Sequence, residues 1–283
     1  MGLAPVIALS HGGGPLPVLG DPSHKSIVYS LTKRIPKLLG LDDPSRRPRA
    51  IILITAHWST SSPTISSAAS PDLIYDYYGF PPESYELKYP AKGDPALAEE
   101  VAAALRAEGL DDTVLDPQRG WDHGVFIPML LVNPAADVPI VQMSVLASED
   151  PTRHLRMGRA LRALRSQGVA IVGSGFASFH NLPVMMSMRQ GANPAQVAQI
   201  IDISRRWNAA LTDVVDKEPW KGLQAWRKLP GADVMHPPRG GEHFMPLIVS
   251  AGAAEEGEKA RWYTDNFSGV DIYTYYWGAD QVE

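Results

Sequence analysis

Short, continuous runs of apolar and β-branched residues recur along this chain, and segments with helical periodicity separate them. The clearest runs lie at residues 5–10 (PVIALS), 50–55 (AIILIT), 138–145 (VPIVQMSV) and 169–173 (VAIVG). Strands that are apolar on both faces are typical of parallel sheets, because helices cover both sides of such a sheet. The alternation therefore predicts an α/β fold with a mostly parallel central sheet and helices on both faces.

The helical segments that separate these runs are predicted at residues 25–39, 94–108, 151–167, 194–215, 220–228 and 242–251. The second of them carries the strongest start signal, with Asp94 as N-cap and Pro95 in the first turn. Two weaker strands are predicted at 112–115 and 272–277, and residues 59–71, rich in Ser, Pro and Ala, are predicted as a loop. Without a long linker or an internal repeat, one domain spanning residues 1–283 is expected.

Composition excludes several kinds of function. The chain has no cysteine, so disulfides, thiolate metal sites and cysteine nucleophiles are excluded. The net charge is −5, and the densest basic cluster, Arg46, Arg47 and Arg49, reads as a solvated loop, so no nucleic-acid partner is expected. There is no apolar run of about 18 residues and no signal-peptide pattern, which predicts a cytoplasmic protein without a membrane partner. A homo-oligomer remains open.

Histidines carry the candidate chemistry. His11 directly follows the first predicted strand and His57 the second. Because sites in open α/β sheets lie beyond the carboxyl ends of strands, these two side chains are expected side by side at one edge of the sheet. Neutral imidazole is a common ligand of iron and zinc. A third ligand from Glu242 or His243 would leave coordination positions open, as an oxygen-activating iron centre requires.

Neighbouring segments offer substrate-binding candidates and two competing motifs. Gly13, in the run GGG, allows close approach of backbone to a ligand, and Trp58 and Tyr78 offer planar rings for a planar substrate. HGGG also resembles an esterase oxyanion-hole motif, but no G-x-S-x-G follows it. The stretch GSGFAS mimics a dinucleotide-binding loop, but it lacks the last glycine.

Seven segments, in this order along the chain, together carry a resemblance to a known family: SHGGGP, TAHW, YDYYGFPPESYELKYPAKGDP, WDHGVFIPM, PIVQMSV, GSGFASFHNL and EHFMPLIVSAGAA. The chain resembles the class III extradiol ring-cleavage dioxygenases of the LigB type, most closely the branch of the DOPA 4,5-dioxygenases. The resemblance runs from His11 to about Ala254. It implies a single LigB-like α/β domain with a mononuclear Fe(II) site, which zinc can also occupy.

The resemblance also implies roles for residues. His11 and His57 match two metal ligands, and the third is His243, with Glu242 as the alternative. His180 matches the acid/base residue near the metal, and His123 a second active-site histidine that orients substrate or donates a proton. The implied reaction is extradiol cleavage of a DOPA- or caffeate-like catechol by dioxygen, giving a muconic semialdehyde.

Two other functions fit the same residues. A zinc-dependent hydrolase could use the same ligands, with His180 activating water for attack on an ester or amide. A non-catalytic binding protein that kept the fold would make the histidines dispensable. Metal identity and oxygen uptake distinguish the dioxygenase from the hydrolase.

Overall fold

The computed structural model describes residues 2–282, and their strands form one eight-stranded sheet in the order β4-β3-β5-β2-β6-β1-β8-β7. Parallel pairing joins β1 to β6, β2 to both β5 and β6, and β3 to β4, whereas the pairs β3–β5, β1–β8 and β7–β8 are antiparallel. The predicted α/β fold with a mostly parallel sheet is confirmed. The strands are β1 (Val6–Ser10), β2 (Ala50–Thr60), β3 (Thr64–Ser66), β4 (Val114–Asp116), β5 (Ile140–Leu146), β6 (Val169–Gly175), β7 (Arg261–Phe267) and β8 (Val270–Trp277).

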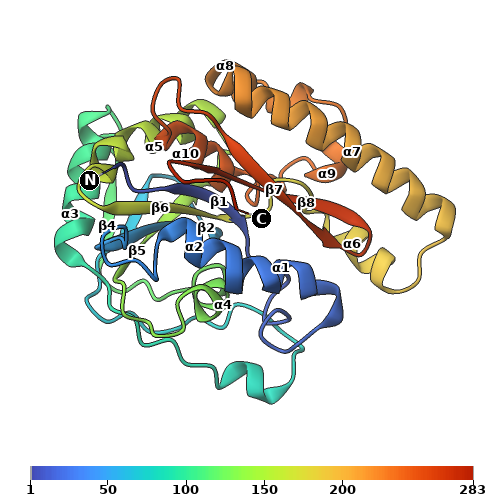
Figure 1. Ribbon diagram of the computed structural model, residues 1–283, viewed down its shortest axis with the longest axis horizontal. Coiled ribbons are helices and arrows are strands. Elements are labelled where there is room, and N and C mark those ends of the chain that lie inside the picture. Colours follow the sequence, from blue (N-terminus) through green and yellow to red (C-terminus); the bar gives the residue numbers. More distant parts are fainter. Residues whose placement is uncertain (1, 283) are drawn as a thin grey trace.

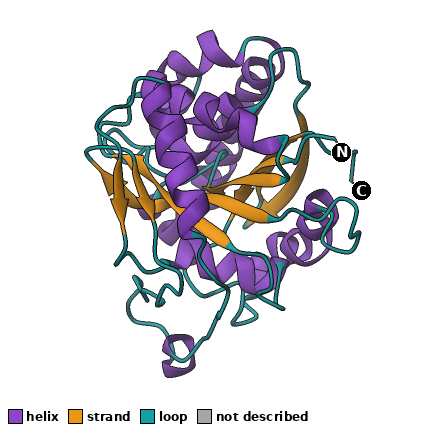
Figure 2. Cartoon of the chain, turned by 90° about the vertical axis from the view of Figure 1, so that its left-hand side faces the viewer, coloured by secondary structure: helices purple, strands orange, loops and turns teal. Residues whose placement is uncertain are grey.

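Helices cover both faces of the sheet (Figures 1 and 2). One face carries α5 and α10, which pack on each other and on β6, together with α3, which packs on α5. The long helix α7 and the short α8 continue this layer, and α7 contacts β8. The other face carries α4 and the N-terminal helical segment. The helices named here are α3 (Pro95–Ala107), α4 (His123–Val132), α5 (Pro151–Arg165), α7 (Pro194–Lys217), α8 (Pro219–Gln224) and α10 (Met245–Ala253).

Several elements differ from the sequence prediction. The helix predicted at 25–39 contains a π-helical turn (η2, Ser30–Arg34) between α1 (Lys25–Tyr29) and α2 (Ile35–Leu39). The helix predicted at 220–228 is α8 followed by a 3₁₀ turn (η4, Trp226–Lys228). Strand β3 lies inside the segment predicted as a loop, and β7 was not predicted. Both escape the apolar-run criterion, since β3 has three residues and β7 alternates exposed and buried side chains.

No helix of residues 2–282 is long and apolar enough to span a membrane.

Two histidines serve the packing of the fold. His154 in α5 is fully buried, where its Nε2 accepts from the Leu146 N–H at 2.9 Å and its Nδ1–H donates to the Asp150 carbonyl at 2.7 Å. Burial lowers the pKa of His154 to about 4. His236 is also buried, and burial lowers its pKa to about 3. Both rings are therefore neutral near pH 7.

These low pKa values make stability pH-dependent. Because an unfolded histidine takes up its proton near pH 6.5, the unfolded state binds more protons than the folded state below that pH. The free energy of unfolding should fall by about 1.4 kcal/mol per pH unit for each such histidine until its folded pKa is reached. Urea unfolding of the wild type and His154→Gln at pH 7 and pH 5 should therefore show an acid-induced loss about 2 kcal/mol smaller in the variant. Equal losses would contradict this assignment.

Candidate metal centre and active site

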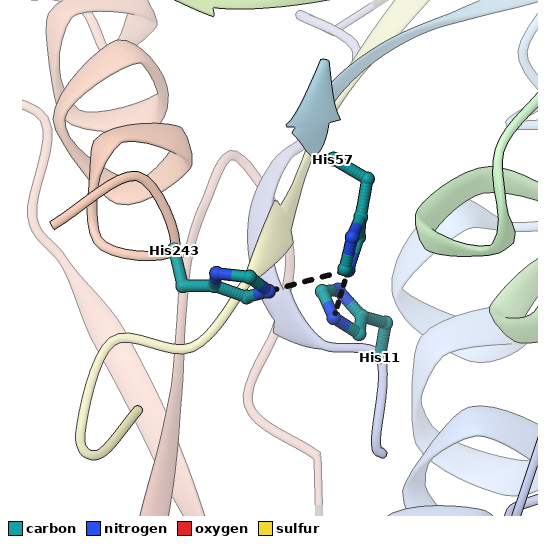
Figure 3. Close-up of side chains that lie close together, drawn as sticks. All are labelled: His11, His57 and His243. Carbon is teal, nitrogen blue, oxygen red and sulfur yellow. Dashed lines mark hydrogen bonds between the residues drawn. The ribbon is translucent and has the colours of Figure 1, made fainter. Parts of the chain in front are cut away.

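Three imidazole rings converge at the carboxyl end of the sheet (Figure 3). The Nε2 atom of His57 lies 3.2 Å from that of His11 and 3.2 Å from that of His243. The ligand atoms of the three residues all lie within 4.8 Å of one another. Nitrogens bound to one ion at 2.0–2.1 Å and at angles of 90–110° lie about 2.9–3.4 Å apart, so this spacing fits a common metal ion.

The outer nitrogens of two of these rings have acceptors that fix the tautomer. Ser174 donates its hydroxyl hydrogen to the Gly124 carbonyl, so its oxygen accepts from His11 Nδ1–H at 3.1 Å. Glu242 Oε1 accepts from His243 Nδ1–H at 2.8 Å. Each ring therefore keeps an unprotonated Nε2 that faces the centre of the cluster. Such outer partners orient ligating histidines and increase their basicity.

His57 occupies an irregularity inside β2 and does not follow the strand as predicted. Ile54 pairs with Met143 and Ser59 pairs with Val145, so five residues of β2 advance while β5 advances two. Bulges of this kind turn side chains out of the ladder and are frequent next to active sites. The Thr55 hydroxyl accepts from the His57 N–H at 3.1 Å and fixes this irregular backbone.

Strand β6 separates the two strands that carry His11 and His57, so these histidines are not on neighbouring strands. They meet because β6 ends in Gly173-Ser174-Gly175, whose small side chains leave space above it. A Cβ on Gly175 would lie 2.4 Å from the carbonyl oxygen of His243, and that carbonyl accepts from the Phe176 N–H at 2.8 Å. The sequence GSG thus serves close packing of the segment that carries His243.

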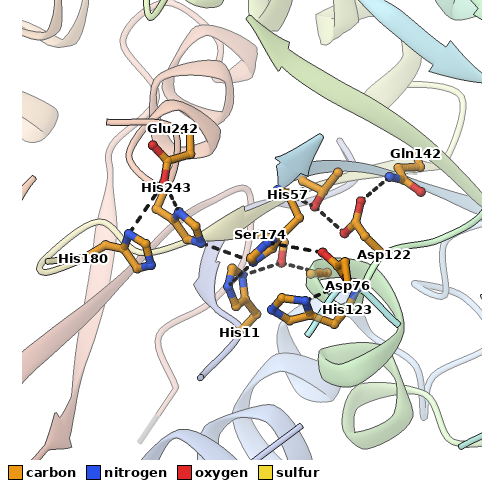
Figure 4. Close-up of polar contacts among 12 residues, drawn as sticks. His11, His57, Asp76, Asp122, His123, Gln142, Ser174, His180, Glu242 and His243 are labelled. Carbon is orange, nitrogen blue, oxygen red and sulfur yellow. Dashed lines mark hydrogen bonds and ion pairs between the residues drawn. The ribbon is translucent and has the colours of Figure 1, made fainter. Parts of the chain in front are cut away.

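His123 lies beside the cluster at the start of α4, and Asp76 holds it (Figure 4). One carboxylate oxygen of Asp76 accepts from the His123 backbone N–H at 2.9 Å and from its Nδ1–H at 2.8 Å. The other oxygen lies 3.5 Å from His57 Nδ1. The His123 ring lies 3.8 Å from the His57 ring, centroid to centroid. Asp76 therefore contacts both a ring of the cluster and a neighbouring histidine.

Glu242 makes a similar arrangement on the opposite side. Besides accepting from His243, its carboxylate lies 3.8 Å from His180 Nδ1. The rings of His180 and His243 stack at 3.4 Å with an interplanar angle of 14°. Glu242 therefore contacts the outer nitrogen of His243 and lies away from the three convergent Nε2 atoms. The geometry brings His243, and not Glu242, together with His11 and His57.

Burial sets the charge state of the site. It lowers the pKa of His11 and His243 well below the ordinary value, and neighbouring imidazoles lower each further. Burial followed by the charge of His123 lowers the pKa of His57 to about 3 and that of His180 to about 4. A cluster of neutral imidazoles can bind a cation without first releasing protons at neutral pH.

The three substrate-binding candidates lie in different environments. The Gly13 N–H already donates to His24 Nε2 at 2.9 Å, so it has a partner within the chain. Trp58 is buried, with the Arg119 guanidinium 4.8 Å from its ring centroid. Tyr78 is 87% exposed, whereas its neighbour Tyr77 packs its ring 5.7 Å from that of His123. The structure thus places Tyr77, which was not among the three, against a histidine of the site.

Sequence reasoning missed three polar residues that support the histidines. They are Asp76, Ser174 and Asp122, the last of which is fully buried and accepts from the Thr55 hydroxyl at 2.7 Å and the Gln142 amide at 2.7 Å. A signal existed for both acids, since Asp122 precedes His123 and Asp76 lies within the aromatic segment YDYYGF. Their partners are distant in sequence, so only the tertiary structure pairs them.

The position of Asp76 leads to a testable expectation. Asp76→Ala should keep bound metal but lower turnover by about 10–100-fold, because His123 and His57 would lose the acceptor that orients them. Metal content and steady-state rates of the purified variant test this. Asp72→Asn, an exposed acid in the same segment, is the matched control and should behave as the wild type. A normal rate for Asp76→Ala would mean that the carboxylate serves folding alone.

Comparisons with known proteins indicate the family of the chain. Residues 6–274 match the family model described as the catalytic LigB subunit of aromatic ring-opening dioxygenase. A protein of Hapsidospora irregularis named dioxygenase tasH is 76% identical, over 100% of this chain and 88% of its own length. A 4,5-DOPA dioxygenase extradiol of Beta vulgaris is 35% identical over 80% of each chain.

A solved structure supports the same relationship. An uncharacterized protein from Escherichia coli K12 superposes with a TM-score of 0.72 at 26% sequence identity, covering 96% of this chain and 99% of that one. The family model matches most of the chain, and the two sequence relatives are similar to it over most of their length. Together they show which family the chain belongs to. The resemblance carried by the seven ordered segments is thereby confirmed, and the chain belongs to the LigB family of aromatic ring-opening, extradiol-type dioxygenases.

Proposed function

We propose that this dioxygenase binds Fe(II) through His11, His57 and His243 and cleaves a catechol ring beside, not between, its two hydroxyl-bearing carbons. Both atoms of dioxygen would enter the product, a muconic semialdehyde. The single observation that supports this most is the convergence of the Nε2 atoms of His11, His57 and His243, with that of His57 3.2 Å from each of the other two. Three protein nitrogens would hold the ion and leave it open to substrates.

The donor set agrees with a mononuclear catalytic site. Three protein ligands with free positions are typical of catalytic ions, whereas structural zinc sites use four ligands and are closed. When bound, the ion would lower the pKa of the catechol hydroxyls and bring substrate and dioxygen together. Zinc fits the same nitrogens, and for this reason metal identity belongs in the test.

The residues around the ion would handle protons. His180 is neutral because burial and the charge of His123 lower its pKa to about 4, so its ring can accept a proton from a catechol hydroxyl. Glu242 lies near its Nδ1, which leaves Nε2 for the substrate. His123 donates its Nδ1–H to Asp76, so its Nε2 is free to orient a substrate oxygen. Phe176, whose ring stacks 5.8 Å from that of His180, and Tyr77 would exclude water from this space.

The substrate class follows from relatives and from the site. The relatives named for DOPA share about a third of their residues with this chain, and the relative at 76% identity is named only as a dioxygenase. Aromatic rings beside the histidines suit a planar phenol. We propose a DOPA- or caffeate-like catechol as the substrate class.

Oxygen consumption tests the proposal. Protein loaded anaerobically with Fe(II) is offered a panel of catechols that includes DOPA and caffeate, and oxygen uptake is followed with the absorbance of a yellow ring-opened product. Iron-dependent uptake with stoichiometric semialdehyde is expected, and zinc-loaded protein should take up none. Hydrolysis of esters or amides by zinc-loaded protein, with no oxygen uptake by iron-loaded protein, would overturn the proposal.

A further inference from the structure

His24 is a buried histidine that the proposed chemistry does not use. Its side chain is buried and lies between the start of α1 and the glycine loop, residues 12–14, that follows His11. Its Nε2 accepts from the Gly13 N–H at 2.9 Å, and its Nδ1–H donates to Asp21 Oδ1 at 3.0 Å. His24 must be neutral to make both bonds, and burial lowers its pKa accordingly. The imidazole thus connects a backbone amide of the glycine loop to a carboxylate.

The same carboxylate extends the connection to another part of the chain. Asp21 Oδ2 accepts from Arg189 Nη2 at 3.2 Å, and Asp21 Oδ1 also accepts from the Ser23 N–H at 3.0 Å. Arg189 is the last residue of α6 (Leu182–Arg189), which begins two residues after His180 with Asn181 as its N-cap. A continuous set of polar contacts therefore runs from Arg189 through Asp21 and His24 to Gly13. We call it the Arg189–Gly13 relay.

The relay joins two segments that adjoin the candidate site. The glycine loop directly follows His11, and α6 begins two residues after His180. Asp21 and Arg189, which form the ion pair between these segments, are 168 residues apart in the sequence. The loop is tightly seated: a Cβ on Gly12, whose φ is +83°, would lie 2.4 Å from Pro17 Cγ and 3.1 Å from His24 Cδ2. A shift of His24 would therefore move the loop next to His11.

The ion pair between Arg189 and Asp21 is the weakest contact of the relay. The Arg189 side chain is 41% exposed and that of Asp21 16%, so solvent and salt screen their attraction. Two apolar side chains of α6, Leu182 and Met186, are 56% and 57% exposed, whereas Met185 is buried against the core. The ion pair at its last residue is accordingly a contact that can open while the buried His24 end stays formed.

We propose that the Arg189–Gly13 relay positions the glycine loop against α6 over the substrate space, so that Arg189 and His24 act as positioning residues for the aromatic substrate. This inference rests on the proposed function, since it assumes that the histidine cluster holds the reacting centre. The relay touches none of the three Nε2 atoms. Its loss should therefore weaken substrate binding while leaving metal binding unchanged.

The first test compares Arg189→Gln with Arg206→Gln in the full-length iron-loaded protein. Arg206 is an exposed arginine of α7 whose partner is Asp202, one turn away, and it serves as the matched control. Arg189→Gln should raise the KM for the catechol by about two- to five-fold, as expected for one exposed ion pair, with kcat within a factor of two. Co(II) titration should give equal metal affinity in both variants. A KM for Arg189→Gln equal to that of Arg206→Gln would overturn the proposal.

A second measurement does not depend on turnover. Hydrogen–deuterium exchange of residues 12–19 should accelerate in Arg189→Gln and more strongly in His24→Ala, and it should stay at the wild-type rate in Arg206→Gln. His24→Gln, whose side-chain oxygen can still accept from the Gly13 N–H, should restore most of the protection. If the wild type turns over no catechol, the proposed function fails. The hydrogen–deuterium exchange rates then test by themselves whether the relay holds the glycine loop. Unchanged exchange in Arg189→Gln and His24→Ala would overturn the relay, whatever the activity.

Discussion

His243→Ala should lose tight Fe(II) binding and reduce catechol-dependent oxygen uptake to background. His243 Nε2 lies 3.2 Å from His57 Nε2, so its removal leaves two nitrogens where three converge. Two imidazoles do not define a face of a coordination sphere, and the ion would be held by mostly water ligands. Metal content after desalting and oxygen uptake with added Fe(II) measure the two effects.

Glu242→Gln is the matched control for the third ligand. Its carboxylate accepts from His243 Nδ1–H and lies outside the convergent nitrogens, so the variant should retain metal and lose about 10–100-fold in affinity or rate. The glutamine oxygen can still accept the same hydrogen bond, which favours the smaller loss. If Glu242→Gln lost the metal and His243→Ala kept it, the ligand assignment would be reversed.

His180→Ala should retain the metal and lose about 10²–10⁴-fold in kcat, the range for removal of a general acid–base group. The ring stacks on His243 but has no nitrogen among the three convergent Nε2 atoms, so metal affinity should change little. Anaerobic catechol binding, followed by the spectrum of the iron–catechol complex, and steady-state oxygen uptake separate binding from turnover. A near-normal rate would contradict the role of His180 as proton acceptor.

His123→Ala serves for comparison with His180→Ala. His123 is held through Asp76 on the other side of the cluster, so the two variants probe opposite sides of the same substrate. If His180 accepts the proton and His123 orients an oxygen, the KM should rise more in His123→Ala and kcat should fall more in His180→Ala. Identical losses in both parameters would mean that the two rings act as one unit.

Much of the architecture could be read from local pattern. The four long apolar runs are β1, β2, β5 and β6, because strands covered on both faces are mostly apolar. The helix at Pro95–Ala107 was predicted within a residue or so at each end, and the Asp94 side chain accepts from the Leu97 N–H as an N-cap should. Strand β3 could not be found, since it has three residues and its pairing partners are distant in sequence.

Part of the candidate site could be predicted from local sequence. His11 and His57 stood out because they lie at the ends of apolar runs, and this is a property of local sequence. Their actual approach depends on β6 lying between their strands and ending in small residues, which local pattern does not contain. Sequence spacing cannot choose between Glu242 and His243, because the two residues are adjacent. Only the direction of the folded backbone determines which of their side chains faces the cluster.

The sequence by itself determined the alternation of strands and helices, the absence of thiol chemistry and the ordered motifs that place the chain in its family. The tertiary structure decided which side chains converge. It brings His243 and not Glu242 to His11 and His57, it pairs Asp76 with His123, and it uses His24 to hold Gly13. The physical reason is the distance in sequence over which each feature is determined. The pattern of apolar residues that predicts a strand or helix spans a few neighbouring residues, whereas a site is built from contacts between residues far apart in the chain.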